Sequence, residues 1–266
     1  MPAEPAIQDQ RTVLDLFRLH GRVALITGGS KGLGQSMALG LAQAGATTVI
    51  CSRHQSDCDA VAADIAAQTG QQSLGIAADV TDEAQVDALF QAVADRCGHL
   101  DVLVNSAGIN ARFLIDECPL EEFRRVLDLN LTGAWLCCRA AMRRMRPQKS
   151  GSIVNIASAL SAVGLEARSP YCSSKAGLLG LTRTLGLEGA PDNVRCNALC
   201  PGPFLTELNR PLLEEPEKVR ALLDRLALKR WADMHEIRGA ALFLASDAST
   251  FVTGTALYVD GGWTAQ

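Results

Sequence analysis

The sequence "TGGSKGLG" occupies residues 27–34 and directly follows the apolar run Val23–Ile26. Its glycines Gly28, Gly32 and Gly34 have the spacing G-x-x-x-G-x-G, and helical periodicity follows over residues 33–44. A strand, a glycine-rich turn and a helix in this order let the backbone approach a phosphate closely. They also direct free N–H groups and the positive end of the helix dipole at that phosphate. The stretch therefore predicts a phosphate-binding turn in an α/β protein.

The order of residues inside this turn bears on which phosphate it binds. A Walker A loop ends in G-K-S or G-K-T, whereas here Lys31 precedes Gly32, and Leu33 follows. Hydrolysis of a nucleoside triphosphate is therefore disfavoured, and the pyrophosphate of a dinucleotide fits the context better. A turn of this composition that binds no ligand is the alternative, and the glycine pattern alone leaves it open.

Short apolar or β-branched runs recur along the chain, separated by longer segments with helical periodicity. Alternating strands and helices form right-handed crossovers, which give a parallel sheet covered by helices on both faces. We therefore predict a doubly wound (Rossmann) α/β domain over residues 15–266, with seven mostly parallel strands. The expected strands are Val23–Ile26, Thr47–Cys51, Ser73–Ala78, Val102–Val104, Ile153–Ala157, Val194–Leu199 and Ala256–Val259.

Two segments fall outside this alternation. Residues 1–14 are rich in proline and polar residues, and we predict a mobile N-terminal lead-in there. Residues 203–230 form a leucine-rich insertion after the sixth expected strand, in a position from which it can cover a pocket. No linker of proline, glycine and serine divides the remainder, so we expect a single domain.

Composition limits the classes of partner. The formal net charge of −4 provides no basic footprint for nucleic acid or for an anionic membrane. No run approaches the ~18 apolar residues of a membrane span, and the start lacks the layout of a secretory signal, so we expect a cytoplasmic protein. Nine cysteines without a C-x-x-C pair and four scattered histidines predict reduced, buried thiols and no metal site. A small-molecule substrate is the expected partner.

The segment "SPYCSSK" (169–175) brings two chemically useful side chains together. Tyr171 and Lys175 are four residues apart at the start of an expected helix, so they share one helical face. A neighbouring ammonium favours the phenolate form of tyrosine, whose ordinary pKa is about 10. Tyr171 is therefore a candidate acid/base, with an ordinary aromatic residue beside a solvated lysine as the alternative.

Ser158 ends the run "SIVNIAS" at the carboxyl end of the fifth expected strand, where doubly wound sheets bind ligands. A hydroxyl there can hydrogen-bond a substrate oxygen and stabilise alkoxide charge. Taken alone, a serine that simply ends a strand is the more common interpretation. Asn130 falls on the apolar stripe of an expected long helix, where its amide must be hydrogen-bonded. A core asparagine without a chemical role explains that pattern equally well.

At this point the sequence resembles the short-chain dehydrogenase/reductase family, whose glycine motif is T-G-x-x-x-G-x-G. Four further segments match the family's pattern in order: "ADV" (78–80), "NSAG" (105–108), "SPYCSSK" (169–175) and "CPGPFLT" (200–206). The resemblance covers residues from about 17 to 266, with Ser106 as a departure where asparagine is commoner. It implies Ser158, Tyr171 and Lys175 as the catalytic set. It also implies that Asn130, in "LNLTG", holds a water that links Lys175 to solvent.

The second strand indicates which cofactor is used. In dinucleotide domains, an acidic residue at its end binds the ribose 2′-hydroxyl of NAD, whereas an arginine accommodates the 2′-phosphate of NADP. Here the strand ends "VICSRH", with Ser52 in the acid's place and Arg53 next, and Lys31 adds a second cation. NADP(H) is therefore preferred and NAD(H) is possible. Two solvated surface cations are the alternative.

The resemblance also implies the remaining cofactor contacts, residue by residue. Asp79 would accept a hydrogen bond from the adenine amine, and Pro201, Gly202 and Thr206 would seat the nicotinamide. The complete expected set is Gly28, Ser30, Lys31, Gly32, Leu33, Gly34, Ser52, Arg53, Asp79, Val80, Asn105, Ala107, Gly108, Tyr171, Lys175, Pro201, Gly202 and Thr206.

Within the family, "GLGQSMALGLAQAGA", "LLDRLALKRW" and "YVDGGWTAQ" resemble the branch that contains gluconate 5-dehydrogenase and 2-dehydro-3-deoxygluconate dehydrogenase. This resemblance implies a homotetramer that interconverts a secondary alcohol and a ketone of a sugar acid or polyol. Arg112, in the segment after the fourth strand, is a candidate to hold the substrate beside Ser158 and Tyr171, or is a surface arginine. A 3-oxoacyl-[acyl-carrier-protein] reductase and a non-catalytic dinucleotide-binding regulator are the alternatives.

Overall fold

The computed structural model describes residues 11–206 and 214–265 of the chain. Seven strands form one sheet in the order β3-β2-β1-β4-β5-β6-β7, and every neighbouring pair is parallel. The order reverses beside β1, which is the switch point of a doubly wound sheet. The predicted fold class is therefore confirmed. The strands are β1 Val23–Thr27, β2 Thr47–Ser52, β3 Ser73–Ala77, β4 Val102–Asn105, β5 Gly151–Ile156, β6 Val194–Pro201 and β7 Ala256–Val259.

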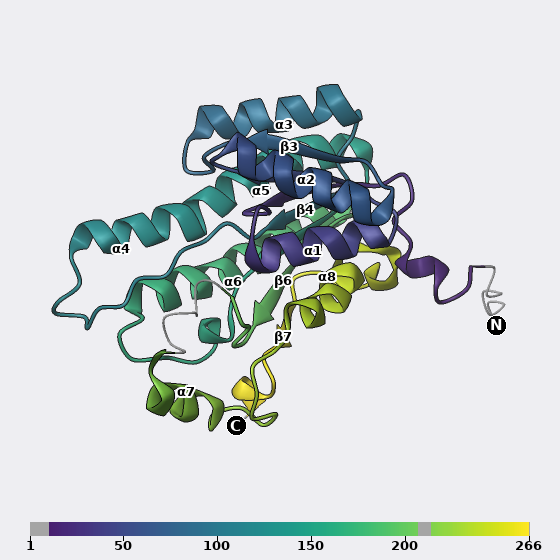
Figure 1. The fold of residues 1–266 in the computed structure, drawn as a ribbon. Helices are drawn as coiled ribbons and strands as arrows, with labels where there is room; N and C mark the ends of the chain where they lie inside the picture. Colours follow the sequence, from purple (N-terminus) through teal and green to yellow (C-terminus); the bar gives the residue numbers. More distant parts are fainter. Residues whose placement is uncertain (1–10, 207–213, 266) are drawn as a thin grey trace, which may run out of the picture.

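Helices cover both faces of this sheet (Figure 1). Alternation along β1 explains how, because Ala24 and Ile26 pack in one core while Val23 and Leu25 pack in the other. Helices α1 Gly32–Gln43, α2 Gln55–Thr69 and α8 Arg238–Ala245 cover the first face. Helices α3 Glu83–Cys97, α5 Ala134–Gln148 and α6 Ser169–Gly189 cover the second, and α4 Leu120–Leu127 and α7 Pro216–Leu223 complete the described helices.

The strand ends differ from the expected ones by at most two residues. The first helix begins at Gly32 rather than at residue 33 and ends at Gln43, a difference of one residue at each end. β6 extends to Pro201, two residues beyond the expected end. Because β6 is longer, its pairing with β7 continues to Pro201, at the carboxyl edge of the sheet.

The long helix expected around Asn130 is interrupted. Residues Asp128–Gly133 form a π-helical turn between α4 and α5. Such turns insert an extra residue into the helical ladder and often accompany functional sites. Asn130 therefore does not continue a regular apolar stripe, as the periodicity predicted, but is presented by an irregular turn.

The two segments outside the alternation are described only in part. Arg11, within the expected lead-in, pairs with Asp247 at 2.7 Å, whereas residues 1–10 lie outside the described residues. In the leucine-rich insertion, Phe204 and Leu226 are each 1% exposed, and Phe204 packs in the core below α1 and α8. Residues 207–213 lie outside the described part, so cover of a pocket by this insertion stays a prediction.

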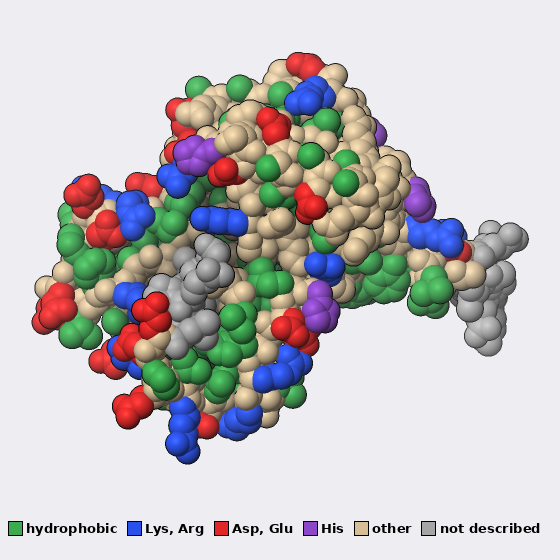
Figure 2. All heavy atoms as spheres, in the orientation of Figure 1, with side chains coloured by type: hydrophobic (Ala, Val, Ile, Leu, Met, Phe, Trp, Pro, Cys, Tyr) green, Lys and Arg blue, Asp and Glu red, His purple; other side chains and the backbone are tan. Residues whose placement is uncertain are grey.

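On the face that Figure 2 shows, Lys and Arg side chains lie among Asp and Glu side chains. None of the described helices is long and apolar enough to cross a membrane. Within residues 11–206 and 214–265, no three His, Cys, Asp or Glu side chains gather as metal ligands would. All nine cysteines are free, and burial raises the pKa of the Cys51 and Cys138 thiols to about 12.

Candidate active site

A cavity of about 650 Å³ lies at the carboxyl ends of the central strands. Ligands bind at this edge in doubly wound sheets, because the strand order reverses there and the loops diverge. The cavity brings together most of the residues that the sequence analysis selected. Its lining includes Gly28, Ser30, Lys31, Gly32, Leu33, Ser52, Arg53, Asp79, Val80, Ala107, Gly108, Ser158, Tyr171, Lys175, Pro201, Gly202 and Thr206.

The glycine turn is held by very close backbone packing. Gly28 has φ of +63°, and a Cβ atom there would lie 2.7 Å from the backbone of Ala107. A Cβ on Gly34 would lie 2.2 Å from the carbonyl oxygen of Gly28. Gly34 does not line the cavity, so it serves the packing of helix against turn. Gly32 has φ of +60° and open space around its Cα, which leaves the start of α1 accessible from the cavity.

Two cations and one carboxylate lie where the second strand ends. Lys31 and Arg53 line the cavity, and within the described part of the chain neither forms an ion pair. Asp57, in the first turn of α2, lines the same end. The Ser52 hydroxyl lies 3.1 Å from the Cys58 thiol, so part of its hydrogen-bonding capacity is used inside the protein. The net charge of this end is positive, which suits a phosphate.

Asp79 and Asn105 are positioned by the protein's own hydrogen bonds. One Asp79 oxygen accepts from the backbone N–H of Thr81 at 2.9 Å and from its hydroxyl at 2.7 Å. Asn105 is 3% exposed and does not line the cavity. Its amide donates to Asn155 at 2.9 Å and to the Cys138 sulfur at 3.2 Å. The Asn105 side chain therefore links β4 to β5 and α5 inside the core. Its neighbours Ala107 and Gly108 line the cavity.

Ser158 is fixed by a capping box. Its Oγ accepts from the N–H of Leu160 at 3.1 Å, and its own N–H donates to the Ser161 hydroxyl at 3.1 Å. Ser158 also hydrogen-bonds the Tyr171 side chain, which favours the phenolate. The serine that ends β5 therefore shares a site with the tyrosine, and its position is rigid.

Lys175 is nearly buried, with 4% of its surface exposed. Its Nζ donates to the carbonyl of Ile156 at 2.6 Å and lies 5.8 Å from the centre of the Tyr171 ring. Burial lowers the pKa of Lys175 to about 8, because the charged form loses hydration. The Lys175 ammonium is thus close to the Tyr171 phenol, but it donates one hydrogen bond to a backbone carbonyl.

Tyr171 differs from expectation in its acidity. The sequence analysis predicted that Lys175 lowers the pKa of the phenol. In the structure, burial is the largest influence and raises the pKa of Tyr171, while the hydrogen bond from Ser158 opposes it. The physical reason is the loss of solvent around the phenol, and the Lys175 ammonium that was expected to offset it donates to the carbonyl of Ile156 instead.

Asn130 is 1% exposed and connects three segments of the site. Its Oδ1 accepts from the N–H of Ile109 at 2.8 Å, and its Nδ2 donates to the carbonyl of Ile109 at 2.9 Å and to the Ser174 hydroxyl at 3.0 Å. A Cβ on Gly108 would lie 3.2 Å from Asn130 Oδ1 and 3.5 Å from Lys175 Nζ. Because Gly108 has no side chain, Asn130 Oδ1 and Lys175 Nζ both lie close to the same small space beside it. That geometry is compatible with a water between them.

Arg112, which was predicted to hold the substrate, is exposed and does not line the cavity. Several residues that do line the cavity were not predicted from the sequence. The missed residues follow strand ends or flank the matched motifs, so the rule that ligands bind at strand ends could have found most of them. They are Cys51, His54, Asp57, Ala78, Ile109, Leu129, Ile156, Ala157 and Phe204.

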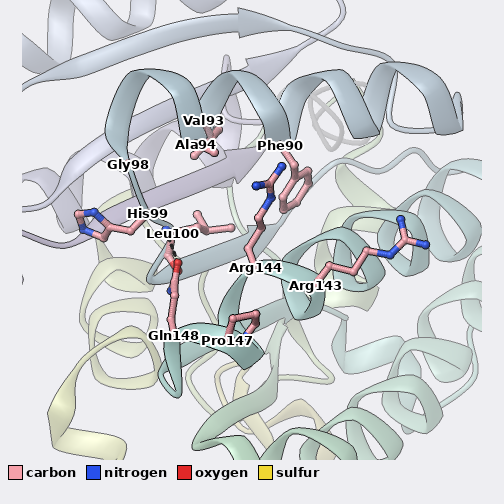
Figure 3. Close-up of a pocket in the computed structure, with 10 residues that line it drawn as sticks. All are labelled: Phe90, Val93, Ala94, Gly98, His99, Leu100, Arg143, Arg144, Pro147 and Gln148. Carbon is pink, nitrogen blue, oxygen red and sulfur yellow. Dashed lines mark hydrogen bonds between the residues drawn. The ribbon is translucent and has the colours of Figure 1, made fainter.

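A smaller hollow of about 240 Å³ lies between the C-terminal halves of α3 and α5 (Figure 3). Its arginines are engaged, because Arg144 donates to Gln91 at 2.7 Å and Arg143 lies 3.8 Å from Asp87. Gln148 exchanges two hydrogen bonds with the backbone of Leu100. This hollow contains none of the residues matched to the catalytic pattern, so the larger cavity is the candidate active site.

Comparisons with known proteins agree with this geometry. The family model described as "Enoyl-(Acyl carrier protein) reductase" matches residues 28–264. The 5-keto-D-gluconate 5-reductase of Escherichia coli (strain K12) is 38% identical over 252 residues, covering 93% of this chain and 97% of that protein. The 3-oxoacyl-[acyl-carrier-protein] reductase of Synechocystis sp. is 38% identical over 246 residues, covering 92% and 97%.

Among solved structures, the gluconate 5-dehydrogenase from Burkholderia cenocepacia J2315, in complex with NADP and tartrate, is 37% identical. It superimposes with a TM-score of 0.93, covering 96% of this chain and 100% of that one. The sheet order, the glycine turn and these matches lead to one conclusion: the chain belongs to the short-chain dehydrogenase/reductase family and is an NAD(P)-dependent oxidoreductase.

Proposed function

We propose that this enzyme interconverts a secondary alcohol and a ketone of a sugar acid or polyol, with NADP(H) as cofactor and Tyr171 as acid/base. The observation that carries the proposal is the single cavity that holds the glycine turn, two cations and the Ser158–Tyr171 pair. Relatives named for 5-keto-D-gluconate, D-threitol and 2-dehydro-3-deoxy-D-gluconate support the choice of substrate class.

The residues fit a dinucleotide. Gly28 and Gly34 leave no room for a side chain beside the turn, and the start of α1 is open to the cavity. Lys31 and Arg53 would hold the 2′-phosphate, and Pro201 and Gly202 lie at the opposite end for the nicotinamide ring. When bound, the cofactor supplies or accepts the hydride.

The protein's own groups handle the proton. In ketone reduction, the Tyr171 phenol donates its proton to the substrate oxygen while the Ser158 hydroxyl hydrogen-bonds the same oxygen. Lys175 stabilises the phenolate that results, and Asn130, held beside it, positions a water that returns a proton from solvent. In alcohol oxidation each transfer runs in reverse.

The second candidate is a 3-oxoacyl-[acyl-carrier-protein] reductase, which the Synechocystis relative favours. A non-catalytic dinucleotide-binding regulator is less well supported, because Asn130, Ser158, Tyr171 and Lys175 are all present and Ser158 contacts Tyr171.

A substrate panel separates these candidates. We expect NADP(H)-linked turnover of a gluconate, ketogluconate or polyol, measured by absorbance of the reduced cofactor. The panel also contains an acetoacetyl thioester and a hydroxysteroid. Activity confined to the thioester would support the carrier-protein reductase instead, and no activity with any compound would favour the regulator.

Tyr171→Phe should lower kcat by about 10² to 10⁴, because a positioned acid/base is lost, while NADPH affinity is retained. In the unaltered enzyme, reduction needs the neutral phenol and should fall as the pH rises through the pKa of Tyr171. Oxidation needs the phenolate and should rise over the same range. The control is Tyr258→Phe, which alters the chain's other tyrosine, on β7. Near-normal turnover by the Tyr171 variant would exclude Tyr171 from the mechanism.

Arg53→Gln should weaken NADPH binding roughly tenfold to a hundredfold, the usual effect of losing a charge-assisted hydrogen bond. NADH has no 2′-phosphate, so its affinity should stay unchanged. Fluorescence titration measures both affinities, and Arg96→Gln, at an exposed arginine of α3, is the control. A wild-type preference for NADH, or equal loss for both cofactors, would contradict the assignment of NADP(H).

We also propose that the enzyme is a homo-oligomer, as expected for a tetrameric family member. On α5, Leu136 packs in the core at 6% exposed. Trp135 remains 44% exposed, and Leu120 and Leu187 are 60% and 78% exposed on α4 and α6. Light scattering at micromolar concentration should therefore give a multiple of the 28.2 kDa chain mass. A stable monomer would refute the assembly.

A further inference from the structure

A one-turn 3-10 helix, Ala159–Ser161, begins directly after Ser158 at the carboxyl end of β5. The sequence "SALS" (158–161) places a second hydroxyl three residues after Ser158, which is the N-cap of this helix. At that spacing, the side chain of the third helical residue can reach back to the N–H of the N-cap. The local sequence therefore connects Ser161 to the serine that lines the cavity.

Ser161 holds both backbone groups of Ser158. The N–H of Ser158 donates to Ser161 Oγ at 3.1 Å, and the N–H of Ser161 donates to the carbonyl of Ser158 at 2.9 Å. The side chain of Ser158 is held as well, because its Oγ accepts from the N–H of Leu160 at 3.1 Å. A rotation of Ser158 about its backbone or its χ1 angle would break at least one of these hydrogen bonds.

The bond from Leu160 determines what the Ser158 hydroxyl can still do. A serine hydroxyl has one proton and two lone pairs, and the N–H of Leu160 occupies one lone pair. The proton is therefore left to be donated. Ser158 is 7% exposed and lines the cavity together with Tyr171. The hydrogen bond from Ser158 favours the phenolate of Tyr171, as expected if the proton points toward the phenol oxygen.

Ser161 can influence the cavity only through Ser158. It is half-buried and does not line the cavity. Within residues 11–206 and 214–265, its hydroxyl has no hydrogen-bond partner besides the N–H of Ser158. The turn itself has other supports, since Ala159 and Leu160 are buried and the N–H of Ala162 donates to the carbonyl of Ala159 at 3.0 Å. The Ser161 hydroxyl is therefore not required to keep the turn in place.

We propose that Ser161 is a positioning residue, which holds Ser158 so that its hydroxyl donates to the oxygen atoms of Tyr171 and of the substrate. The inference rests on the proposed function and adds to it a residue outside the cavity. A donor that is already aimed at the position of developing charge stabilises the transition state without reorganisation. Loss of the Ser161 hydroxyl would let Ser158 turn away for part of the time, so that this stabilisation decreases.

The kinetic test uses the substrate that the panel identifies. Ser161→Ala should lower kcat about twofold to tenfold, the usual effect of one hydrogen bond, with little change in KM or in NADPH affinity. Its pH profile for oxidation should also move to higher pH, because the Ser158 hydrogen bond that lowers the pKa of Tyr171 is weakened. Ser161→Thr keeps the hydroxyl and should restore both values.

The matched control is Ser249→Ala. Ser249 ends another 3-10 helix, Asp247–Ser249, and its hydroxyl donates to the carbonyl of Ser246, three residues earlier. This variant removes the same group from the same kind of turn, away from the cavity, so kcat and the pH profile should stay at their wild-type values. Thermal unfolding of both alanine variants measures how much each hydroxyl contributes to stability alone.

A second measurement needs neither substrate nor cofactor. The chain has two tyrosines, so in a Tyr258→Phe background the ultraviolet absorbance of the phenolate reports Tyr171 alone. Ser161→Ala and Ser158→Ala should each raise the midpoint of this titration. The combined variant should titrate like Ser158→Ala, because a residue that acts through Ser158 has no further effect once the Ser158 hydroxyl is gone.

An unchanged midpoint in Ser161→Ala, or a further shift of the same size in the combined variant, would overturn the proposal. A fall in kcat that Ser161→Thr does not restore, or that Ser249→Ala reproduces, would assign Ser161 to the stability of the turn and would overturn it as well. Failure of the proposed function is recognised separately, as the absence of turnover by the wild-type enzyme with every compound of the panel. The phenolate titration then still decides whether Ser161 positions Ser158.

Discussion

The contact between the glycine turn and the loop after β4 is the constraint on which the site depends. Gly28 is so close to Ala107 that no side chain fits between them, and a side chain on Gly34 would collide with the carbonyl oxygen of Gly28. This packing sets the start of α1 beside the β4 loop. The absence of side chains at Gly28 and Gly32 leaves the start of α1 open to the cavity, whose lining also contains charged residues such as Lys31 and Arg53.

Helix α6, which carries Tyr171 and Lys175, is linked to the same loop by one amide, that of Asn130. Asn130 hydrogen-bonds both backbone groups of Ile109 and also the hydroxyl of Ser174, which in turn donates to the carbonyl of Tyr171 at 2.8 Å. The π-helical turn interrupts the helix at the position where the Asn130 amide forms these three hydrogen bonds. The loop after β4 and the segment that carries Tyr171 are therefore positioned by one buried hydrogen-bond network.

The sequence was sufficient for the fold and for most of the cavity. Strand ends were predictable because apolar runs stop where the chain must turn, and Tyr171 and Lys175 were predictable because four residues make one helical turn. The partners of the Asn105 side chain were not predictable, because strand periodicity does not tell which buried polar side chain a neighbouring strand will satisfy. The acidity of Tyr171 was also missed, since desolvation depends on packing from distant segments. The β-bridge between Phe113 and Arg168 was also not predictable, because a pairing between two loops leaves no periodic signal.

Charge is distributed unevenly along the cleft of a protein whose formal net charge is −4. Lys31 and Arg53 stand at the end where the second strand stops. Among the other described residues that line the cavity, the one lysine or arginine is Lys175, whose pKa is lowered to about 8 by burial. An anion bound beside Lys31 and Arg53 would make the local potential more negative and favour the ammonium form of Lys175. In the proposed mechanism this ammonium stabilises the phenolate of Tyr171, so binding of an anionic cofactor and proton transfer would be electrostatically coupled.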